Sequence, residues 1–133
     1  MDYTSKNHSK YLLVVHLIFV TKYRKPLLVE YGQEVKGILE DVSKEQGFEI
    51  VTMEVDKDHV HLLVSYAPVL SVVEIVRLLK QITTYRLWRQ NDSKAHLSTE
   101  FWGKQTFWSS GYFACSIGNA SMETIEMYIK NQG

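Results

Sequence analysis

The spacing of hydrophobic residues changes along the chain, and each change marks a new element. Segment 11–21 is almost continuously apolar and rich in Leu, Val, Ile and Phe, which predicts a well-buried strand. Segment 28–47 repeats its apolar residues at helical spacing and ends on Gly47, a residue suited to a helix C-cap. Segments 48–56 and 59–66 favour strands, and the short turn between them predicts a hairpin.

The second half of the chain continues this alternation. Ser71 is a good N-cap for a long helix that runs to about residue 91. Residues 92–111 are expected to be irregular or to hold a short helix, and residues 112–117 to form a short strand. Ser121 is then expected to cap a final helix that continues to the C-terminus.

The predicted order is strand, helix, hairpin, helix, strand, followed by a final helix. The first five elements are typical of the split β-α-β topology of ferredoxin-like folds. We therefore expect an α+β protein: a ferredoxin-like antiparallel sheet with two long helices on one face, and a C-terminal helix. The other face of the sheet needs a cover, which could be the last helix, a partner subunit or a ligand.

Length and composition limit the class of protein. The 133 residues and 45 % hydrophobic content fit one folded domain, 1–133, and exclude a disordered chain. The single cysteine, Cys115, excludes an internal disulfide and a cysteine-rich zinc site. The longest apolar run, Tyr11–Val20, is shorter than the roughly 20 residues of a membrane-spanning helix, so we expect no membrane segment and a cytoplasmic protein.

The net charge of the chain is zero, but the charge is unevenly distributed. Residues 1–29 carry +4, residues 30–58 carry −6, and residues 72–104 carry +3. This distribution favours a local basic surface on a folded domain over a protein that coats nucleic acid indiscriminately.

The sharpest chemical feature is the pair of histidines His59 and His61, separated by Val60. Residues two apart on a strand point to the same face, so the two imidazoles lie side by side while Val60 points away. Two imidazoles on a rigid strand make half of a metal site; the alternative is two polar residues on a solvated face. For the preceding Asp58 we favour a solvated turn carboxylate over a group that orients a histidine. His16, within the apolar first strand, is interpreted as a hydrogen-bonded core histidine.

The predicted final helix offers further polar groups. Tyr128 and Gln132 are four residues apart, so they share one face of a helix. A helix laid across the open face of the sheet would bring both side chains beside the two histidines. The alternative for Tyr128 is a structural surface aromatic.

These residues resemble a known family, the small single-tyrosine HUH transposases of IS200-like insertion sequences, whose name describes the His-hydrophobic-His strand. The resemblance covers nearly the whole chain. It rests on blocks that occur in the family's order and spacing: Lys22-Tyr23-Arg24-Lys25 with Leu27-Leu28, Asp58-His59-Val60-His61-Leu62-Leu63, Phe107-Trp108, Gly111-Tyr112-Phe113 and Tyr128-Ile129-Lys130-Asn131-Gln132.

The resemblance implies a transposase that cleaves and rejoins single-stranded DNA at insertion-sequence ends through a 5′-phosphotyrosine intermediate. Tyr128 would be the nucleophile, and His59, His61 and Gln132 would hold Mg²⁺ or Mn²⁺. A phenol, with a pKa of ~10, is a weak nucleophile at neutral pH, and a divalent ion assists it by polarising the phosphate. The family also implies hairpin-bearing single-stranded DNA as the partner and a homodimer, in which one subunit's tyrosine can serve the other's histidines.

Candidate DNA contacts are basic or aromatic residues that neutralise phosphates or stack on bases. The alternatives are a solvated helix face for the basic residues, and a core or dimer interface for the aromatic ones. The candidates are Lys22, Tyr23, Arg24 and Lys25 after the first strand, Arg77 and Lys80 on the second long helix, and Trp102 and Trp108 in the aromatic-rich segment 101–113.

Two other functions stay open from the sequence. One is a domesticated relative that processes chromosomal repeat hairpins. The other is a non-catalytic, ferredoxin-like module that binds nucleic acid or metal. Formation of a covalent protein–DNA adduct distinguishes both enzymes from the module.

Overall fold

The computed structural model describes residues 4–6, 9–11, 13–116 and 129–131. Two short strands near the N-terminus, β1 (Thr4–Lys6) and β2 (Ser9–Tyr11), form an antiparallel pair that the sequence did not predict. The remaining elements follow the predicted order: β3 (Leu13–Val20), the 3-10 helix η1 (Lys22–Arg24), α1 (Leu28–Gln46), β4 (Glu49–Val55), β5 (His59–Tyr66), α2 (Val72–Arg89), α3 (Asn91–Glu100) and β6 (Phe113–Ser116).

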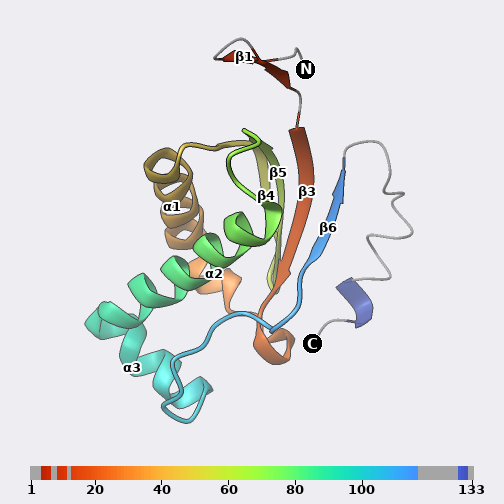
Figure 1. The fold of residues 1–133 in the computed structure, drawn as a ribbon. Helices are drawn as coiled ribbons and strands as arrows, with labels where there is room; N and C mark the ends of the chain where they lie inside the picture. The colour runs from red at the N-terminus through yellow and green to blue at the C-terminus, as the bar shows by residue number, and fades with distance from the viewer. Residues whose placement is uncertain (1–3, 7–8, 12, 117–128, 132–133) are drawn as a thin grey trace.

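The main sheet has four strands in the order β4-β5-β3-β6, and each neighbouring pair is antiparallel. Both long helices, α1 and α2, lie on the same side of this sheet (Figure 1). The two helices that connect the strands are therefore on one face, as the split β-α-β topology requires. The predicted α+β, ferredoxin-like fold is confirmed.

The hydrophobic core lies between the two helices and the sheet. Alternate residues of the central strands point into it, including Leu17 and Phe19 of β3 and Leu62 of β5, all fully buried. The intervening residues of β3 point to the opposite, open face, where Ile18 and Val20 form a second, small cluster with Phe113 and Ile129. This alternation follows from the two-residue period of a strand and assigns each chemical group to one face.

Local sequence signals define the ends of the two long helices. The Ser71 side chain accepts a hydrogen bond from the Glu74 backbone N–H, and the Glu74 carboxylate accepts one in return from the Ser71 backbone, so α2 begins with a capping box. Gly47 ends α1 with φ of 81°, a left-handed conformation that favours glycine. Both caps were predicted.

The predicted final helix lies largely outside the described residues. Residues 129–131 are helical, and they lie on the side of the sheet away from α1 and α2 (Figure 1). Tyr128 and Gln132, the two site residues predicted on this helix, fall outside the described part of the chain. Among the described helices, none is long and apolar enough to cross a membrane.

Candidate metal centre and nucleic-acid interface

The two histidines of β5 lie on the open face of the sheet, as predicted. Their register partners on β3 are Val20 for His59 and Ile18 for His61, the residues of the small open-face cluster. Val60 between them is fully buried on the helix side. The strand therefore holds two half-buried imidazoles side by side, next to the apolar residues Ile18 and Val20 of β3.

Asp58 orients the first of these imidazoles, and our preferred interpretation of it as a solvated turn carboxylate was wrong. The residue is only 4 % exposed. Its carboxylate accepts hydrogen bonds from His59 Nδ1 at 3.0 Å and from Arg24 Nε at 3.2 Å. Burial alone would raise the pKa of the Asp58 carboxyl, but these hydrogen bonds outweigh burial and hold its pKa below the ordinary value. Asp58 is therefore a charged acceptor that fixes the ring of His59 and leaves His59 Nε2 out of this hydrogen bond.

His61 has a neighbour that the sequence did not identify. Its Nε2 lies 3.0 Å from Nδ1 of His16, and the two ring centroids are 5.2 Å apart. His16 is hydrogen-bonded, as predicted, but it is half-buried on the open face and does not lie in the core. Burial first, and then the neighbouring His16, lower the pKa of His61, which keeps its imidazole neutral and able to bind a cation at neutral pH.

The described end of the last helix reaches this same face. Ile129, the residue after Tyr128, packs against Ile18 and Val20. The carbonyl of Lys130 accepts a hydrogen bond from Arg24 Nη1 at 3.4 Å. Because Arg24 also donates to Asp58, one guanidinium connects the last helix to the residue that precedes the histidine strand.

The imidazoles of His59 and His61 are suitable ligands for a divalent ion, although the described residues supply only part of a coordination shell. Within them, no three His, Cys, Asp or Glu side chains converge on one point. Two adjacent imidazoles remain, and the Asp58 hydrogen bond to His59 is the outer-shell contact expected behind a metal-ligating histidine. Gln132, the third ligand that the family resemblance implies, lies outside the described residues.

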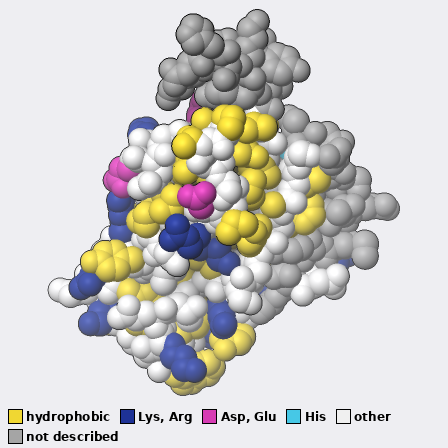
Figure 2. All heavy atoms as spheres, in the orientation of Figure 1, with side chains coloured by type: hydrophobic (Ala, Val, Ile, Leu, Met, Phe, Trp, Pro, Cys, Tyr) yellow, Lys and Arg dark blue, Asp and Glu magenta, His cyan; other side chains and the backbone are white. Residues whose placement is uncertain are grey.

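A second feature, which we name the aromatic corner, lies where η1 meets the loop after α3. It lines a cavity of ≈ 280 Å³. Tyr23 is 56 % exposed and Trp102 is 76 % exposed, with ring centroids 6.3 Å apart. Figure 2 shows basic side chains beside hydrophobic ones at this lower end of the molecule. The residues that line the cavity are Lys22, Tyr23, Phe101, Trp102, Lys104 and Thr106.

The backbone of the aromatic corner is strained. Tyr23, Arg24 and Trp102 have φ of 60°, 52° and 52°, a left-handed region that costs a side chain of this size about 1 kcal/mol or more. Such strain concentrates at functional sites. The backbone that carries the two exposed rings therefore has a conformation that these residue types rarely adopt on their own.

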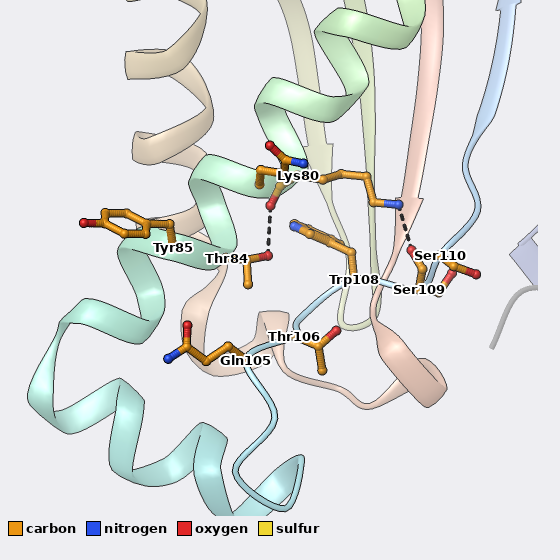
Figure 3. Close-up of a pocket in the computed structure, with 9 residues that line it drawn as sticks. Lys80, Thr84, Tyr85, Gln105, Thr106, Trp108, Ser109 and Ser110 are labelled. Atoms are coloured by element: carbon orange, nitrogen blue, oxygen red, sulfur yellow. Dashed lines mark hydrogen bonds between the residues drawn. The ribbon is translucent and has the colours of Figure 1, made fainter.

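The other basic candidates differ in accessibility. Lys25 forms an ion pair with Glu100 at 3.1 Å, and its Nζ lies 5.9 Å from the Trp102 ring centroid. Arg77 is exposed on α2. Lys80, on the same helix, donates to the carbonyls of Ser109 at 2.7 Å and Gly111 at 3.1 Å, so its ammonium anchors the segment that enters β6 (Figure 3).

Trp108 was wrongly predicted as a stacking platform. It is 5 % exposed and packs edge-to-face against Phe19 and Phe107, with ring centroids 5.8 Å and 4.8 Å away. The indole lies under α2, at the wall of a ≈ 350 Å³ cavity that Lys80 and Thr84 also line (Figure 3). Packing on the sheet explains this burial, because Thr21 and Trp108 form an isolated bridge that continues β3.

Comparisons with known proteins place these features in context. The family described as "Transposase IS200 like" matches residues 9–132. The ISDra2 transposase TnpA of Deinococcus radiodurans is 34 % identical over 123 residues, covering 92 % of this chain and 85 % of the relative. The transposase for insertion sequence element IS200 of Salmonella typhimurium is 28 % identical over 135 residues, covering 98 % and 84 %.

Solved structures share the fold. The crystal structure of a Deinococcus radiodurans R1 protein assigned as a transposase has a TM-score of 0.85 at 32 % identity, and each chain is covered to 96 %. A REP-associated tyrosine transposase bound to a REP hairpin has a TM-score of 0.58 at 14 % identity, covering 94 % of this chain and 68 % of the other.

Proposed function

The chain belongs to the IS200-like transposase family, and from this premise we propose that it cleaves and rejoins single-stranded DNA at insertion-sequence ends. Tyr128 is the proposed nucleophile, and His59, His61 and Gln132 the proposed ligands of Mg²⁺ or Mn²⁺. The observation that carries this proposal is the open face of the sheet. There, Asp58 fixes one of two adjacent imidazoles, and the neighbour of Tyr128 in the chain, Ile129, packs beside them.

The proposed reaction exchanges one phosphodiester for another. The phenolic oxygen of Tyr128 attacks the scissile phosphorus, and the bond from phosphorus to the 3′ oxygen breaks. The phenol loses its proton, the departing 3′ oxygen gains one, and the 5′ phosphate remains on the tyrosine. Attack by another 3′-OH reverses these changes and joins the strands, so no ATP is consumed.

The protein's own groups assist this reaction by position and charge. His59 and His61 would hold a divalent ion through imidazole nitrogens, which add no negative charge, and the ion would supply positive charge to polarise a non-bridging phosphate oxygen. Asp58 holds His59 in one tautomer, with the proton on Nδ1 and the lone pair on Nε2. Arg24 connects Asp58 to the carbonyl of Lys130 and thereby ties the last helix to the histidine strand.

We assign the aromatic corner as the main DNA contact. Lys22, together with Lys104, supplies charge for phosphates, while Tyr23 and Trp102 present exposed ring faces on which unpaired bases can stack. Hairpin DNA is the proposed substrate, a class of ligand that one relative of the same fold binds. A homodimer is proposed as well, because a second copy would bring a second DNA end.

Covalent capture tests the proposed activity. The protein is incubated with single-stranded hairpin oligonucleotides from candidate element ends and Mn²⁺, and adducts are resolved on a denaturing gel. We expect an adduct with the wild type, none with Tyr128→Phe, and none with the double variant His59→Ala, His61→Ala. Tyr85→Phe is the matched control, because Tyr85 is an exposed tyrosine on α2, away from the open face.

Two results would contradict the proposal. An adduct formed by Tyr128→Phe would assign the chemistry to another tyrosine. Hairpin binding without any adduct, across all ends and ions tested, would favour the non-catalytic binding module.

A further inference from the structure

A third histidine contacts the proposed ion site from a different strand. His16 lies on β3, and its register partner on β5 is Leu63, so its contact with His61 runs diagonally across the sheet. His16 Nδ1 and His61 Nε2 are 3.0 Å apart, within the range of a hydrogen bond. The position of His16 in an apolar strand does not explain this contact, and the proposed reaction gives His16 no role.

The contact resembles the one that Asp58 makes with His59. In both cases one nitrogen of a β5 imidazole is bonded to a protein group: Nδ1 of His59 to Asp58, and Nε2 of His61 to His16. A neutral imidazole carries one N–H and one lone pair. If His61 donates its Nε2–H, then its Nδ1 lone pair is the one available for a cation. If His16 donates instead, the Nε2 lone pair is consumed and the remaining nitrogen carries a proton.

We propose that His16 is a positioning residue of the ion site, accepting the Nε2–H of His61 through its own Nδ1. His16 thereby fixes the tautomer of His61 and the orientation of its ring, with the Nδ1 lone pair left for the ion. The proposal rests on the proposed role of His61 as a metal ligand, which it extends to a residue outside the His-hydrophobic-His strand. Partners of this kind contribute about 10- to 100-fold to metal affinity.

The substitutions His16→Leu and His16→Asn separate this role from a structural one. Leucine keeps apolar bulk on the open face but offers no acceptor. The Oδ1 of asparagine reaches close to the position of Nδ1 in histidine, so it accepts the same hydrogen bond. We expect His16→Leu to weaken Mn²⁺ binding about 10- to 100-fold in an electron paramagnetic resonance titration, and His16→Asn to stay within about 3-fold of the wild type. Thermal unfolding confirms that both variants are folded.

Nitrogen-15 spectra of the histidine rings test the hydrogen bond itself, without ion or DNA. We expect the Nε2–H tautomer for His61 in the wild type and in His16→Asn, and a mixture of tautomers in His16→Leu. An Nδ1–H tautomer in the wild type would overturn the proposal. Unchanged Mn²⁺ affinity in His16→Leu would also overturn it. Tighter Mn²⁺ binding in this variant would overturn it too, because it would show that His16 competes with the ion for His61.

Failure of the proposed ion site gives a different result. If the double variant His59→Ala, His61→Ala has the same Mn²⁺ affinity as the wild type, then His59 and His61 are not ligands. His16 then has no role in ion binding either. The tautomer of His61 would still report whether the His16 bond exists. The two failures are therefore distinguishable.

Discussion

Replacing Asp58 with asparagine should weaken both the fold and the proposed ion site. The carboxylate is buried and accepts from two donors, His59 Nδ1 at 3.0 Å and Arg24 Nε at 3.2 Å. Asparagine keeps the volume and one acceptor oxygen, but its NH₂ group then faces the second donor. Hydrogen bonds to charged groups contribute about 1.5–3 kcal/mol, so we expect the free energy of unfolding to fall by about 2 kcal/mol.

The pH dependence of this loss has a definite sign. The pKa of Asp58 in the folded protein is below its ordinary value of 3.8. The unfolded chain therefore takes up this proton more readily, and the carboxylate's contribution is fully present above the unfolded pKa and lost as pH falls through the folded one. The stability difference between wild type and Asp58→Asn should be largest at neutral pH and shrink below about pH 4 in urea unfolding.

The second effect of Asp58→Asn concerns the ion. Without the carboxylate, the ring of His59 is no longer held in one orientation, and we expect Mn²⁺ affinity to fall about 10- to 100-fold. Cleavage of a hairpin oligonucleotide should fall with it and recover as Mn²⁺ is raised. Asp56→Asn is the matched control, because Asp56 is an exposed carboxylate in the same turn that accepts only from the Lys57 backbone among the described residues. Wild-type Mn²⁺ affinity in Asp58→Asn would refute the reasoning.

Other substitutions test the remaining contacts. Trp102→Ala should weaken hairpin binding by about 1–3 kcal/mol for each stacked base, whereas Val29→Ala, also at a 76 % exposed residue, should not; equal losses would argue against stacking. Lys80→Met should lower the free energy of unfolding by about 1–3 kcal/mol by removing the hydrogen bonds that the ammonium donates to two carbonyls, and unchanged urea unfolding would contradict this. Tyr31→Phe should remove a 2.6 Å hydrogen bond with His96 and cost about 1 kcal/mol at neutral pH. Burial raises the pKa of Tyr31 to about 12, so the wild type should lose stability between about pH 10 and 12, where only its unfolded chain ionises, and the difference from Tyr31→Phe should close there. At physiological salt the protein should prefer hairpin over matched duplex DNA and scatter light as a dimer; equal affinities or a monomeric mass would contradict both expectations.

Much of the fold was predictable because its signals are local. The helical spacing over 28–47, the Ser71 cap and the hairpin around Lys57-Asp58 each depend on a few neighbouring residues, and each is found close to its predicted bounds. The pair β1–β2 was missed, since strands of three residues carry too little hydrophobic periodicity to identify.

The sequence by itself determined which face each strand residue takes. A two-residue period is a property of the extended backbone, so His59 and His61 had to share one face and Val60 the other. Tertiary structure decided which distant residues meet them. Strand order and register bring His16 to His61, and the turn after β3 brings Arg24 to Asp58. The same packing buries Trp108 and exposes Trp102, two tryptophans that composition could not distinguish, because burial depends on contacts between segments far apart in the chain.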